Sequence, residues 1–579
     1  MAKRVIIFGA GDTGKKAFHA LGKQYEIAAF ADNGSGNYGK KLFGLPVISP
    51  EEISSYNVEL LIIASVYHVE IAKQLYSMGL KNMKLFWPSE ESGSYTLLEL
   101  YEGDPFSGCI YKKPDVKHGG GMQRIAHRGD RKRVLVIAYY FPPVGGSAVQ
   151  RTLKFVKYLR EYGYEPVVLT TKPDPGLDKY SMDASLLPEI PEDIQVVRVK
   201  DDFSWPDVIS KGKAQEITEF LYSIAGSEEW MGLFLEAQKT QPRYILPDKL
   251  ILWANECVRH VEEYVDMKEI DLIYSTAPYW SPHLAAYFLK QRYGICWVAD
   301  YRDPWVSNRD YVKLYYPWMT EKEVALDRQL EKKLVKAMDL IVVAGGKWAD
   351  DFVEGYGVPS SKIREITNGY DEEDFAKLDV KTEKNSKFTL CYNGAVGYNR
   401  NPIPMLQVLN SMIERNVLKK DEIRWIFNGA ISGDYAKKMA ANDQYHIVVQ
   451  NGMLPHRDSL QISMDSDVMV MYGEPGEKGY LNYPGKFYEY LRIGKPILCF
   501  SSDRSFQADV LKETGLGVNM DLYDLKGIEA FLKKRMAAWR NGREPDLGSA
   551  EVIRKYERKN LTRMLADGFD NVLGSSGNL

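Results

Sequence analysis

The residues whose types and spacing most clearly indicate chemistry lie between positions 482 and 500, in the stretch NYPGKFYEYLRIGKPILCF. Pro484 suits the first turn of a helix, where a missing N–H group costs nothing. The apolar residues that follow it at helical spacing are Phe487, Tyr490 and Leu491. The stretch therefore predicts a loop that turns into a short helix, which ends near Gly494 before a buried strand.

The start of this predicted helix combines a cation and an acid. Free N–H groups and the positive end of the helix dipole favour a phosphate at such a position. Lys486 lies beside it, and Glu489 follows one turn later, where a carboxylate can accept two sugar hydroxyls. We therefore expect a site for a nucleotide sugar. The alternative is an ordinary ion pair on the first turn of a helix.

A second candidate site lies at the N-terminus, where an apolar strand runs into Gly9-x-Gly11-x-x-Gly14 and then a helix. The next strand, EIAAFAD, ends at Asp32. This is the dinucleotide fingerprint in its usual context of strand, turn, helix and acidic strand end. The glycines let the backbone approach a phosphate, and Asp32 can accept from ribose hydroxyls. The alternative is a docking domain that keeps its glycines for folding.

The N-terminal unit has room for only about four strands, so we expect one mononucleotide-binding half rather than a full NAD domain. It resembles the small Rossmann-like units found ahead of bacterial sugar acyltransferases and methyltransferases, and the phrase GLPVISPEE at positions 44–52 is similar. The resemblance implies a nucleotide or a nucleotide sugar as its ligand.

A β-loop-α-β rhythm begins again at Val134, with a strand that leads into Gly145 and Gly146 and then an amphipathic helix. Later strands of this unit end in Ser275-Thr276 and in the run from Asp300 to Asp303. Open α/β sheets hold their ligands at such strand ends. We expect Asp300 to contact the reacting region from this domain. The alternative is a structural ion pair that holds the loop.

The third unit repeats the pattern with four further strands before position 482. Asn393, Gly394 and Arg400 follow its first strand, so they are expected to face the same cleft as Lys486. Two cations that converge there can hold a diphosphate leaving group without a metal ion. The fold class is thus α/β, with two Rossmann-like domains facing across a cleft and a small Rossmann-like domain before them.

Length and composition agree with a multidomain globular protein. The 579 residues are too many for one core, and a net charge of −3 gives no case for nucleic-acid binding. The five scattered cysteines indicate a reducing compartment and argue against a structural zinc site. The apolar runs fall short of the roughly 18 residues of a membrane span, and the start of the chain is predicted to be a strand. We expect a cytoplasmic protein.

The predicted domains are a small Rossmann-like domain (1–104), a linker (105–131), an acceptor domain (132–380) and a donor-binding domain (381–579) whose final helix could cross back. Between positions 112 and 133 the chain carries eight Lys or Arg against two Asp, around a run of three glycines. Such a basic segment can touch anionic lipid head groups, so peripheral contact with the inner face of a membrane is one hypothesis. A merely solvated linker is the alternative.

Residues of about 131 to 575 resemble a GT-B glycosyltransferase of the retaining family 4 type. The features that carry the resemblance are, in order, the loop FPPVGG, the strand ends STAP and DYRDPW, the turn NGYDEEDF and the helix PGKFYEYLRIGKPI. The resemblance implies transfer of a sugar from a nucleotide sugar to a glycan or lipid-linked acceptor, with retention of configuration and without a metal or other cofactor. Bacterial surface polysaccharide biosynthesis is the expected context.

Family roles fall on particular residues of this chain. The resemblance assigns Glu489 to the donor ribose, Arg400 and Lys486 to the pyrophosphate, and the backbone of Gly145 and Gly146 to the cleft. The other residues that we expect at the donor site are Gly485, Phe487, Gly394 and Asn368.

Two departures from the family pattern stand out. Leu481 occupies the position of an earlier glutamate, and Ala395 that of an arginine. The first puts a sugar-hydroxyl contact in doubt, and the second weakens the grip on phosphate.

Two alternatives to a transferase remain. One is a nucleotide-sugar epimerase, which shares the two-domain architecture but needs catalytic carboxylates and histidines that the sequence does not visibly bring together. The other is a scaffold or sensor that binds a nucleotide sugar without turning it over.

Overall fold

The computed structural model of the chain describes residues 3–65, 68–80, 82–88, 95–99, 131–172, 183–200, 246–248, 250–379, 385–397, 400–474, 480–481, 483–542 and 549–576. The predicted basic linker, and with it the hypothesis of membrane contact, lies almost entirely outside these residues. None of the described helices is long and apolar enough to cross a membrane.

Seven strands of the described residues form the sheet of the N-terminal unit, in the order β3-β4-β2-β1-β5-β6-β7. They are β1 (Lys3–Phe8), β2 (Tyr25–Ala31), β3 (Lys41–Leu42), β4 (Leu45–Ile48), β5 (Leu60–Ile63), β6 (Met83–Pro88) and β7 (Tyr95–Glu99). Helices α1 (Asp12–Leu21) and α2 (His68–Ser77) follow β1 and β5. The predicted number of about four strands is too low. The four predicted strands form the parallel centre, and short strands at both edges add the rest.

The next unit, which we call the first lobe, contains a parallel sheet in the order β10-β9-β8-β11-β12-β13-β14. Its strands are β8 (Lys132–Ile137), β9 (Tyr164–Lys172), β10 (Gln195–Lys200), β11 (Leu272–Ala277), β12 (Cys296–Tyr301), β13 (Leu340–Val343) and β14 (Ile363–Glu365). Its described helices are α3 (Ser147–Tyr158), α7 (Ile251–Tyr264), α8 (Ser281–Tyr293), α9 (Arg309–Tyr315), α10 (Glu321–Ala337) and α11 (Ala349–Tyr356). Both faces of the sheet are covered, since its residues belong to two separate hydrophobic cores.

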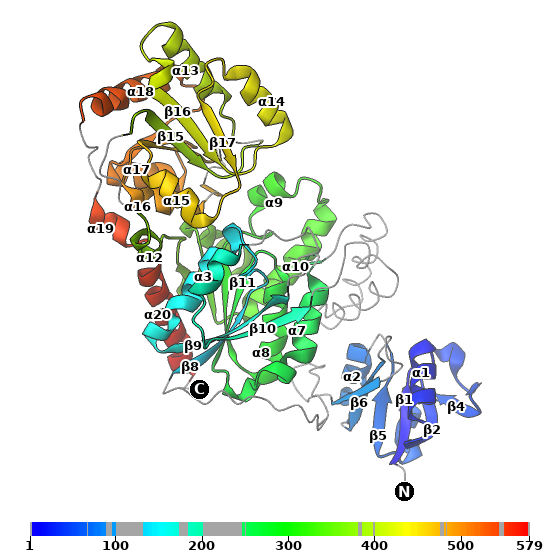
Figure 1. Cartoon of the computed structure of the whole chain (residues 1–579). Coiled ribbons are helices and arrows are strands. Elements are labelled where there is room, and N and C mark those ends of the chain that lie inside the picture. Colours follow the sequence, from blue (N-terminus) through cyan, green and yellow to red (C-terminus); the bar gives the residue numbers. More distant parts are fainter. Residues whose placement is uncertain are drawn as a thin grey trace.

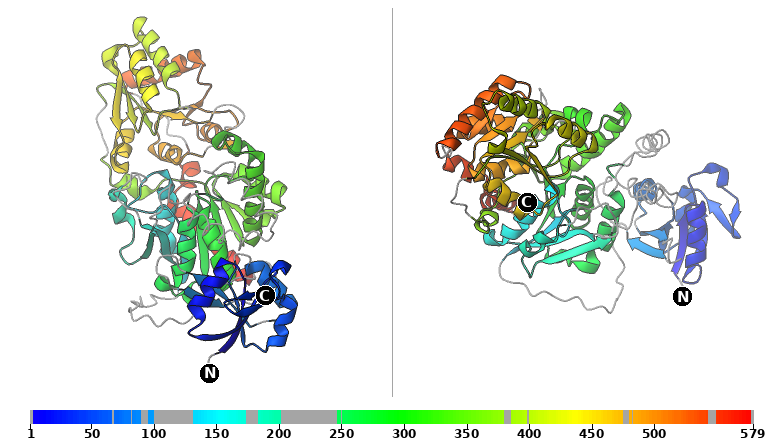
Figure 2. Two further views of the ribbon diagram at one scale, coloured as in Figure 1. Left: turned by 90° about the vertical axis from the view of Figure 1, so that its right-hand side faces the viewer. Right: turned by 45° about the horizontal axis from the view of Figure 1, so that its top comes forward.

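The second lobe contains a parallel sheet in the order β17-β16-β15-β18-β19-β20. Its strands are β15 (Phe388–Asn393), β16 (Ile423–Asn428), β17 (Val448–Gly452), β18 (Val468–Tyr472), β19 (Ile497–Phe500) and β20 (Gly517–Asn519). Its helices are α12 (Glu372–Ala376), α13 (Ile403–Glu414), α14 (Gly433–Asn442), α15 (His456–Met464), α16 (Gly485–Ile493), α17 (Phe506–Thr514), α18 (Leu525–Arg540) and α19 (Ala550–Arg554). The second lobe lies above the first in Figure 1 and in the left view of Figure 2.

Within the described residues the chain passes between the lobes twice, and the two passages run side by side. Tyr370 pairs with Glu557 in a parallel bridge, and the N–H of Tyr370 donates to the carbonyl of Tyr556 at 3.1 Å. Gly369 is required here because a Cβ would lie 2.1 Å from that carbonyl oxygen. The first passage comes before the predicted boundary at position 380, since Phe375 already packs into the core of the second lobe.

The final helix, α20 (Arg558–Ser576), returns to the first lobe, where it lies beside α3 and β8 (Figure 1). Leu561, Leu565 and Phe569 pack into the core of that lobe. The prediction of an α/β fold is confirmed: two Rossmann-like domains follow a smaller Rossmann-like domain, in the arrangement of a GT-B fold.

Candidate functional site

Lys486 lies in the first turn of α16, as predicted, and its ammonium group reaches the end of strand β15. Nζ donates to the carbonyl of Asn393 at 2.6 Å and to the hydroxyl of Tyr392 at 3.1 Å, and it lies 4.3 Å from the centre of the Tyr392 ring. Gly394 makes this approach possible, because a Cβ there would lie 2.5 Å from Nζ and its φ is +128°. The structure thus brings two predicted site residues, Lys486 and Gly394, into contact.

The electrostatics of Lys486 link it to Arg400. Burial lowers the pKa of Lys486 to about 7, the nearby positive charge of Arg400 adds to this lowering, and Glu489 opposes it. The backbone of Arg400 is fixed by a hydrogen bond from its N–H to the carbonyl of Gly397 at 2.9 Å. The positive charge of Arg400 is therefore felt at Lys486, and an anion bound there would relieve this repulsion.

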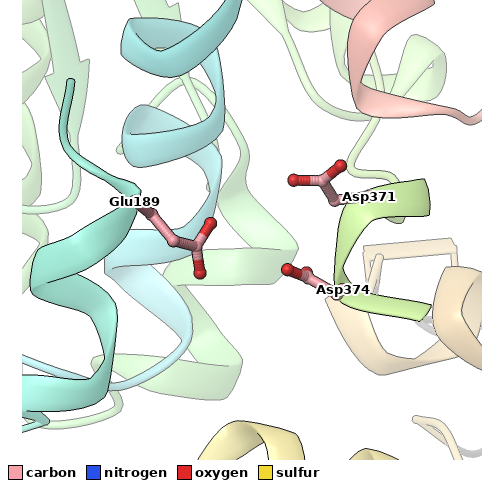
Figure 3. A group of neighbouring side chains, drawn as sticks. All are labelled: Glu189, Asp371 and Asp374. Carbon is pink, nitrogen blue, oxygen red and sulfur yellow. The ribbon is translucent and has the colours of Figure 1, made fainter. Parts of the chain in front are cut away.

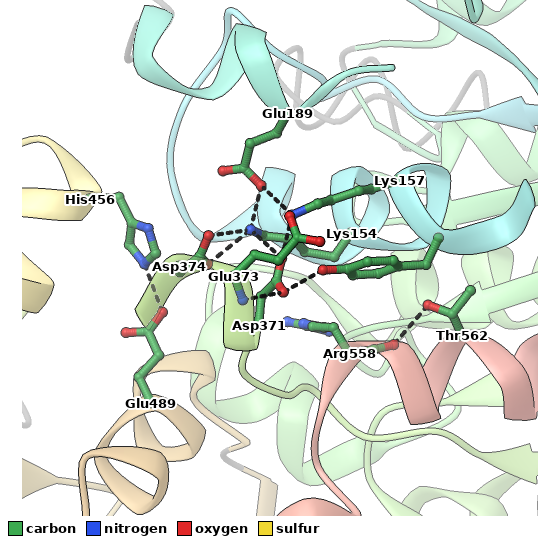
Figure 4. A network of polar contacts seen from close by, with 11 residues as sticks. Lys154, Lys157, Glu189, Asp371, Glu373, Asp374, His456, Glu489, Arg558 and Thr562 are labelled. Carbon is green, nitrogen blue, oxygen red and sulfur yellow. Dashed lines mark hydrogen bonds and ion pairs between the residues drawn. The ribbon is translucent and has the colours of Figure 1, made fainter. Parts of the chain in front are cut away.

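Glu489 is held by a residue that the sequence analysis missed. Nε2 of His456, the first residue of α15, lies 2.8 Å from Oε1 of Glu489 (Figure 4). Burial alone would lower the pKa of His456, but the Glu489 carboxylate raises it to about 9. Burial alone would raise the pKa of Glu489, and His456 more than offsets this. The pair is therefore ionised at neutral pH. The sequence carries no spacing signal for it, since the partners are 33 residues apart.

A network of charges joins α3 of the first lobe to the passage between the lobes (Figure 4). Nζ of Lys154 contacts Asp374 at 2.7 Å and Asp371 at 2.8 Å, and it also pairs with Glu189. Nζ of Lys157 contacts Asp371 at 2.8 Å. Asp374 helps to raise the pKa of His456, so this network reaches the Glu489 pair electrostatically. The network therefore links α3 of the first lobe to Asp371 and Asp374, and through Asp374 it acts on the pair of His456 and Glu489 at the predicted donor site.

Three carboxylates of this network, from Glu189, Asp371 and Asp374, converge closely enough to suggest a metal site (Figure 3). The ammonium group of Lys154 already lies among all three. After burial, the nearby positive charge of Lys154 is the largest influence on the pKa of Asp371, and it helps to hold that pKa well below the ordinary value. The ammonium group of Lys154 therefore occupies the space between the three carboxylates, and the cluster is an ion-pair network rather than an open metal site.

Asp300 is completely buried in strand β12. Its two oxygens accept from Nε and Nη2 of Arg151, each at 2.8 Å, and Oδ2 also accepts from Tyr274 at 2.8 Å and Thr276 at 3.0 Å. Arg151 in turn donates to the carbonyls of Ile366 and Thr367, at the passage between the lobes. This geometry favours the structural alternative for Asp300 and argues against contact with a reactant.

Asp303, three residues further along, differs from Asp300. It follows the end of β12, its side chain is 36% exposed, and it pairs loosely with Arg302 at 3.3 Å. The acid that this strand end presents outward is therefore Asp303. The sequence analysis placed both aspartates at this strand end. Only the position of each residue along the folded strand shows that Asp300 is buried and Asp303 is partly exposed.

The remaining predicted donor residues divide between the site and the core. Phe487 is completely buried against Phe506, so it packs the helix rather than facing a ligand. Gly485 starts α16 and has open space at its Cβ position. The side chain of Asn368 donates to the carbonyl of Tyr483 at 3.1 Å, which fixes the segment before α16 to the passage between the lobes.

The predicted glycine pair lies at the start of α3. Gly145 is buried, whereas Gly146 is exposed and has a φ of +96°. Gly146 caps the helix, and a Cβ there would meet open space. Its positive φ rather than crowding thus accounts for this glycine.

The three glycines of the N-terminal fingerprint differ in whether packing requires them. A Cβ at Gly9 would lie 2.3 Å from the oxygen of Ala64, and a Cβ at Gly14 would lie 1.8 Å from the oxygen of Gly9. Both are therefore required for packing. Gly11 has open space instead. Asp32 accepts the N–H of Ala10 at 2.8 Å, so it also holds the glycine loop.

Comparisons of sequence identify two segments of the chain. Residues 1–86 match the family model described as C2185-like, N-terminal, and residues 228–374 match the model described as Glycosyltransferase Family 4. The described part of the second segment belongs to the first lobe, except for its last residues, which pass to the second lobe and end inside α12. No curated protein matches the chain in sequence.

Comparisons with solved structures find several that are similar over about three quarters of the chain. They include Anabaena Alr3699/HepE in complex with UDP and glucose, with 12% identity and a TM-score of 0.48 over 76% of this chain and 100% of that chain. Sucrose-phosphate synthase from Thermosynechococcus elongatus has 13% identity and a TM-score of 0.47 over 77% and 100%. UDP-GlcNAc 2-epimerase from Neisseria meningitidis, bound to UDP-GlcNAc, has 12% identity and a TM-score of 0.44 over 76% and 99%.

Proposed function

We propose that this protein is a glycosyltransferase that uses a nucleotide sugar as donor. The observation that carries the proposal is the position of Lys486, whose pKa is lowered by the charge of Arg400, one helical turn before the ionised pair of Glu489 and His456. Two cations suit a diphosphate, and a fixed carboxylate one helical turn away suits the hydroxyls of a ribose. The family 4 match in the first lobe supports the same assignment.

The chemistry follows from what these groups can stabilise. Departure of a nucleoside diphosphate leaves positive charge on the sugar and negative charge on the phosphate. Cations fixed in advance near the leaving phosphate lower the barrier without a strong base. We propose that Lys486 and Arg400 do this without a metal ion, that the configuration of the sugar is retained, and that the acceptor is a glycan or a lipid-linked saccharide of bacterial surface polysaccharide.

The test is release of nucleotide from a panel of UDP-, GDP- and dTDP-sugars, measured with and without a lipid-linked acceptor. Release that requires the acceptor is the expected result. Binding without release in either condition would indicate the scaffold, and conversion of the donor sugar without release would indicate the epimerase.

Variants connect this activity to the proposed site. Lys486→Ala should lower kcat by about tenfold to a thousandfold, as expected when a preorganised charge near a leaving group is removed. Glu489→Ala should mainly raise the KM for the donor. Lys534→Ala, which removes an exposed lysine of α18, is the matched control and should leave both constants unchanged. Unchanged turnover in the first two variants would contradict the site.

We further propose that the N-terminal unit binds a nucleotide or a nucleotide sugar at its glycine loop. The support is Gly11, whose side-chain position is open although Gly9 and Gly14 are required for packing. In the full chain, Gly11→Val should abolish one of two nucleotide-binding events seen by calorimetry, while Lys486→Ala should affect the other. A single event that Gly11→Val leaves intact would favour the docking alternative.

A further inference from the structure

Glu474 is a buried carboxyl group at the carboxyl end of the second-lobe sheet that the sequence analysis did not single out. It follows β18, which lies between β15 and β19, and its exposed fraction is 6%. The carbonyl of Glu474 accepts the N–H of Ser502 at 3.2 Å, which fixes its backbone to the loop after β19. Its position is therefore set by two neighbouring strand ends.

A residue of the opposite lobe holds its side chain. The hydroxyl of Tyr315, at the end of α9, donates to Oε1 of Glu474 at 3.2 Å. Burial and then Glu474 raise the pKa of Tyr315, Asp303 acts in the same direction, and Arg400 opposes them. Asp303 and Tyr315 from the first lobe thus lie within electrostatic reach of Glu474 and Arg400 from the second.

Glu474 and Tyr315 lie next to the proposed diphosphate site at Lys486 and Arg400. Arg400 acts on both Tyr315 and Lys486. Two residues before Glu474, the ring of Tyr472 lies 5.1 Å from the ring of Tyr392, whose hydroxyl accepts from Lys486. A sugar joined to a diphosphate at Lys486 and Arg400 would therefore extend into the space where the two lobes meet.

We infer that Glu474, held by Tyr315, together with Asp303 forms the subsite for the transferred sugar, and that this sugar carries no carboxylate. The inference rests on the proposed function and adds the class of donor. Carboxylate oxygens accept hydrogen bonds from sugar hydroxyls, whereas they repel a sugar that itself carries a carboxylate. Glu474 would also supply a hydroxyl contact of the kind put in doubt by Leu481.

The experiment first identifies which of UDP, GDP and dTDP binds the full chain, by calorimetry. It then compares the neutral and the uronic-acid sugar of that nucleotide, for example UDP-glucose and UDP-glucuronic acid. The wild type should bind the neutral donor at least about tenfold more tightly than the acidic one, because like charges that meet in a desolvated site repel each other. Glu474→Gln should lose most of this preference while its affinity for the free diphosphate stays unchanged.

Tyr315→Phe keeps the carboxylate and removes only its cross-lobe hydrogen bond, so it should weaken binding of the neutral donor without weakening that of the diphosphate. Glu551→Gln, an exposed acid on α19, changes the net charge equally and should have no effect. Wild-type preference for the acidic donor, or an unchanged preference in both Glu474→Gln and Tyr315→Phe, would overturn the inference and leave the proposed function standing. Failure of all three diphosphates to bind would overturn both.

Discussion

Lys486 donates its protons to a hydroxyl and a carbonyl oxygen, neither of which carries a full negative charge. Burial and the charge of Arg400 consequently lower its pKa to about 7. A diphosphate supplies the missing negative charge, so binding should favour the protonated lysine and take up a proton when the pH is above 7.

The expected result is an affinity for the nucleoside diphosphate that falls by up to about tenfold per pH unit between pH 7 and 8.5. Titration calorimetry in buffers of different ionisation enthalpy would show the proton uptake directly. Lys486→Arg keeps the charge over this range, so its affinity should be nearly independent of pH. Equal slopes in the wild type and this variant would show that Lys486 is not the titrating group.

His456 makes the stability of the protein depend on pH, because its pKa is raised, whereas that of Lys486 is lowered. Its pKa is raised from the ordinary value to about 9 by Glu489, so the stabilisation is complete below about pH 6.5 and is lost as the pH rises towards 9. It faces Glu489, Asp374 and Lys154. We expect the wild type to exceed His456→Gln in stability by about 1–3 kcal/mol at pH 6.5.

Thermal unfolding of the two proteins across this range provides the measurement. The difference in Tm should shrink steadily between pH 6.5 and 9. A difference that is constant with pH would mean that His456 contributes packing and not charge.

At the scale of the residue, the sequence predicts what lies on one helix turn and misses what folding brings from elsewhere. Lys486 and Glu489 could be found because their spacing and the helix start are local. His456 and Glu474 could not, since their partners, Glu489 and Tyr315, are 33 and 159 residues away in the sequence. Phe487 was misassigned because helical spacing alone does not say which face meets the core.

At the scale of the element, Arg151 fixes helix α3 to strand β12 and to the passage between the lobes. Removing one partner of such a buried pair leaves the other uncompensated, which costs about 3–5 kcal/mol. Asp300→Asn should therefore lower the Tm clearly while kcat per folded molecule changes little.

A double variant, Arg151→Met with Asp300→Asn, provides the control. It removes both charges and should recover part of the lost stability. If Asp300→Asn instead keeps the wild-type Tm and abolishes turnover, Asp300 acts in the reaction and the structural assignment fails.

The elements that the sequence predicts well are those with long apolar runs. Parallel strands buried on both faces, such as β8 and β18, contain runs of four consecutive Val, Ile, Leu or Met residues. Strand β3 has only two residues, too few for any periodicity, and its pairing with β4 depends on the turn between them. The sequence also does not predict toward which face of the sheet each side chain of β12 points, since a strand covered on both faces shows no alternation of polar and apolar residues.

At the scale of the whole molecule, two lobes are joined by paired passages and by the ion-pair network of Lys154. Contacts across the lobes, such as Tyr315 with Glu474 and Asn368 with Tyr483, lie beside the proposed donor site. Donor binding should therefore depend on how the lobes are oriented. The sequence predicts the order of the domains and a final helix that could cross back, and the folded chain shows this helix as α20, packed into the core of the first lobe.

The measurement that tests the central claim most directly is calorimetric titration of the full chain with UDP, GDP and dTDP, in the wild type, in Lys486→Ala and in the control Lys534→Ala. One of the three diphosphates should bind the wild type and the control equally. Its affinity for Lys486→Ala should be about tenfold to a hundredfold lower, as expected for the loss of a charge-assisted hydrogen bond. Equal affinity for all three proteins would contradict the claim that Lys486 holds the departing diphosphate.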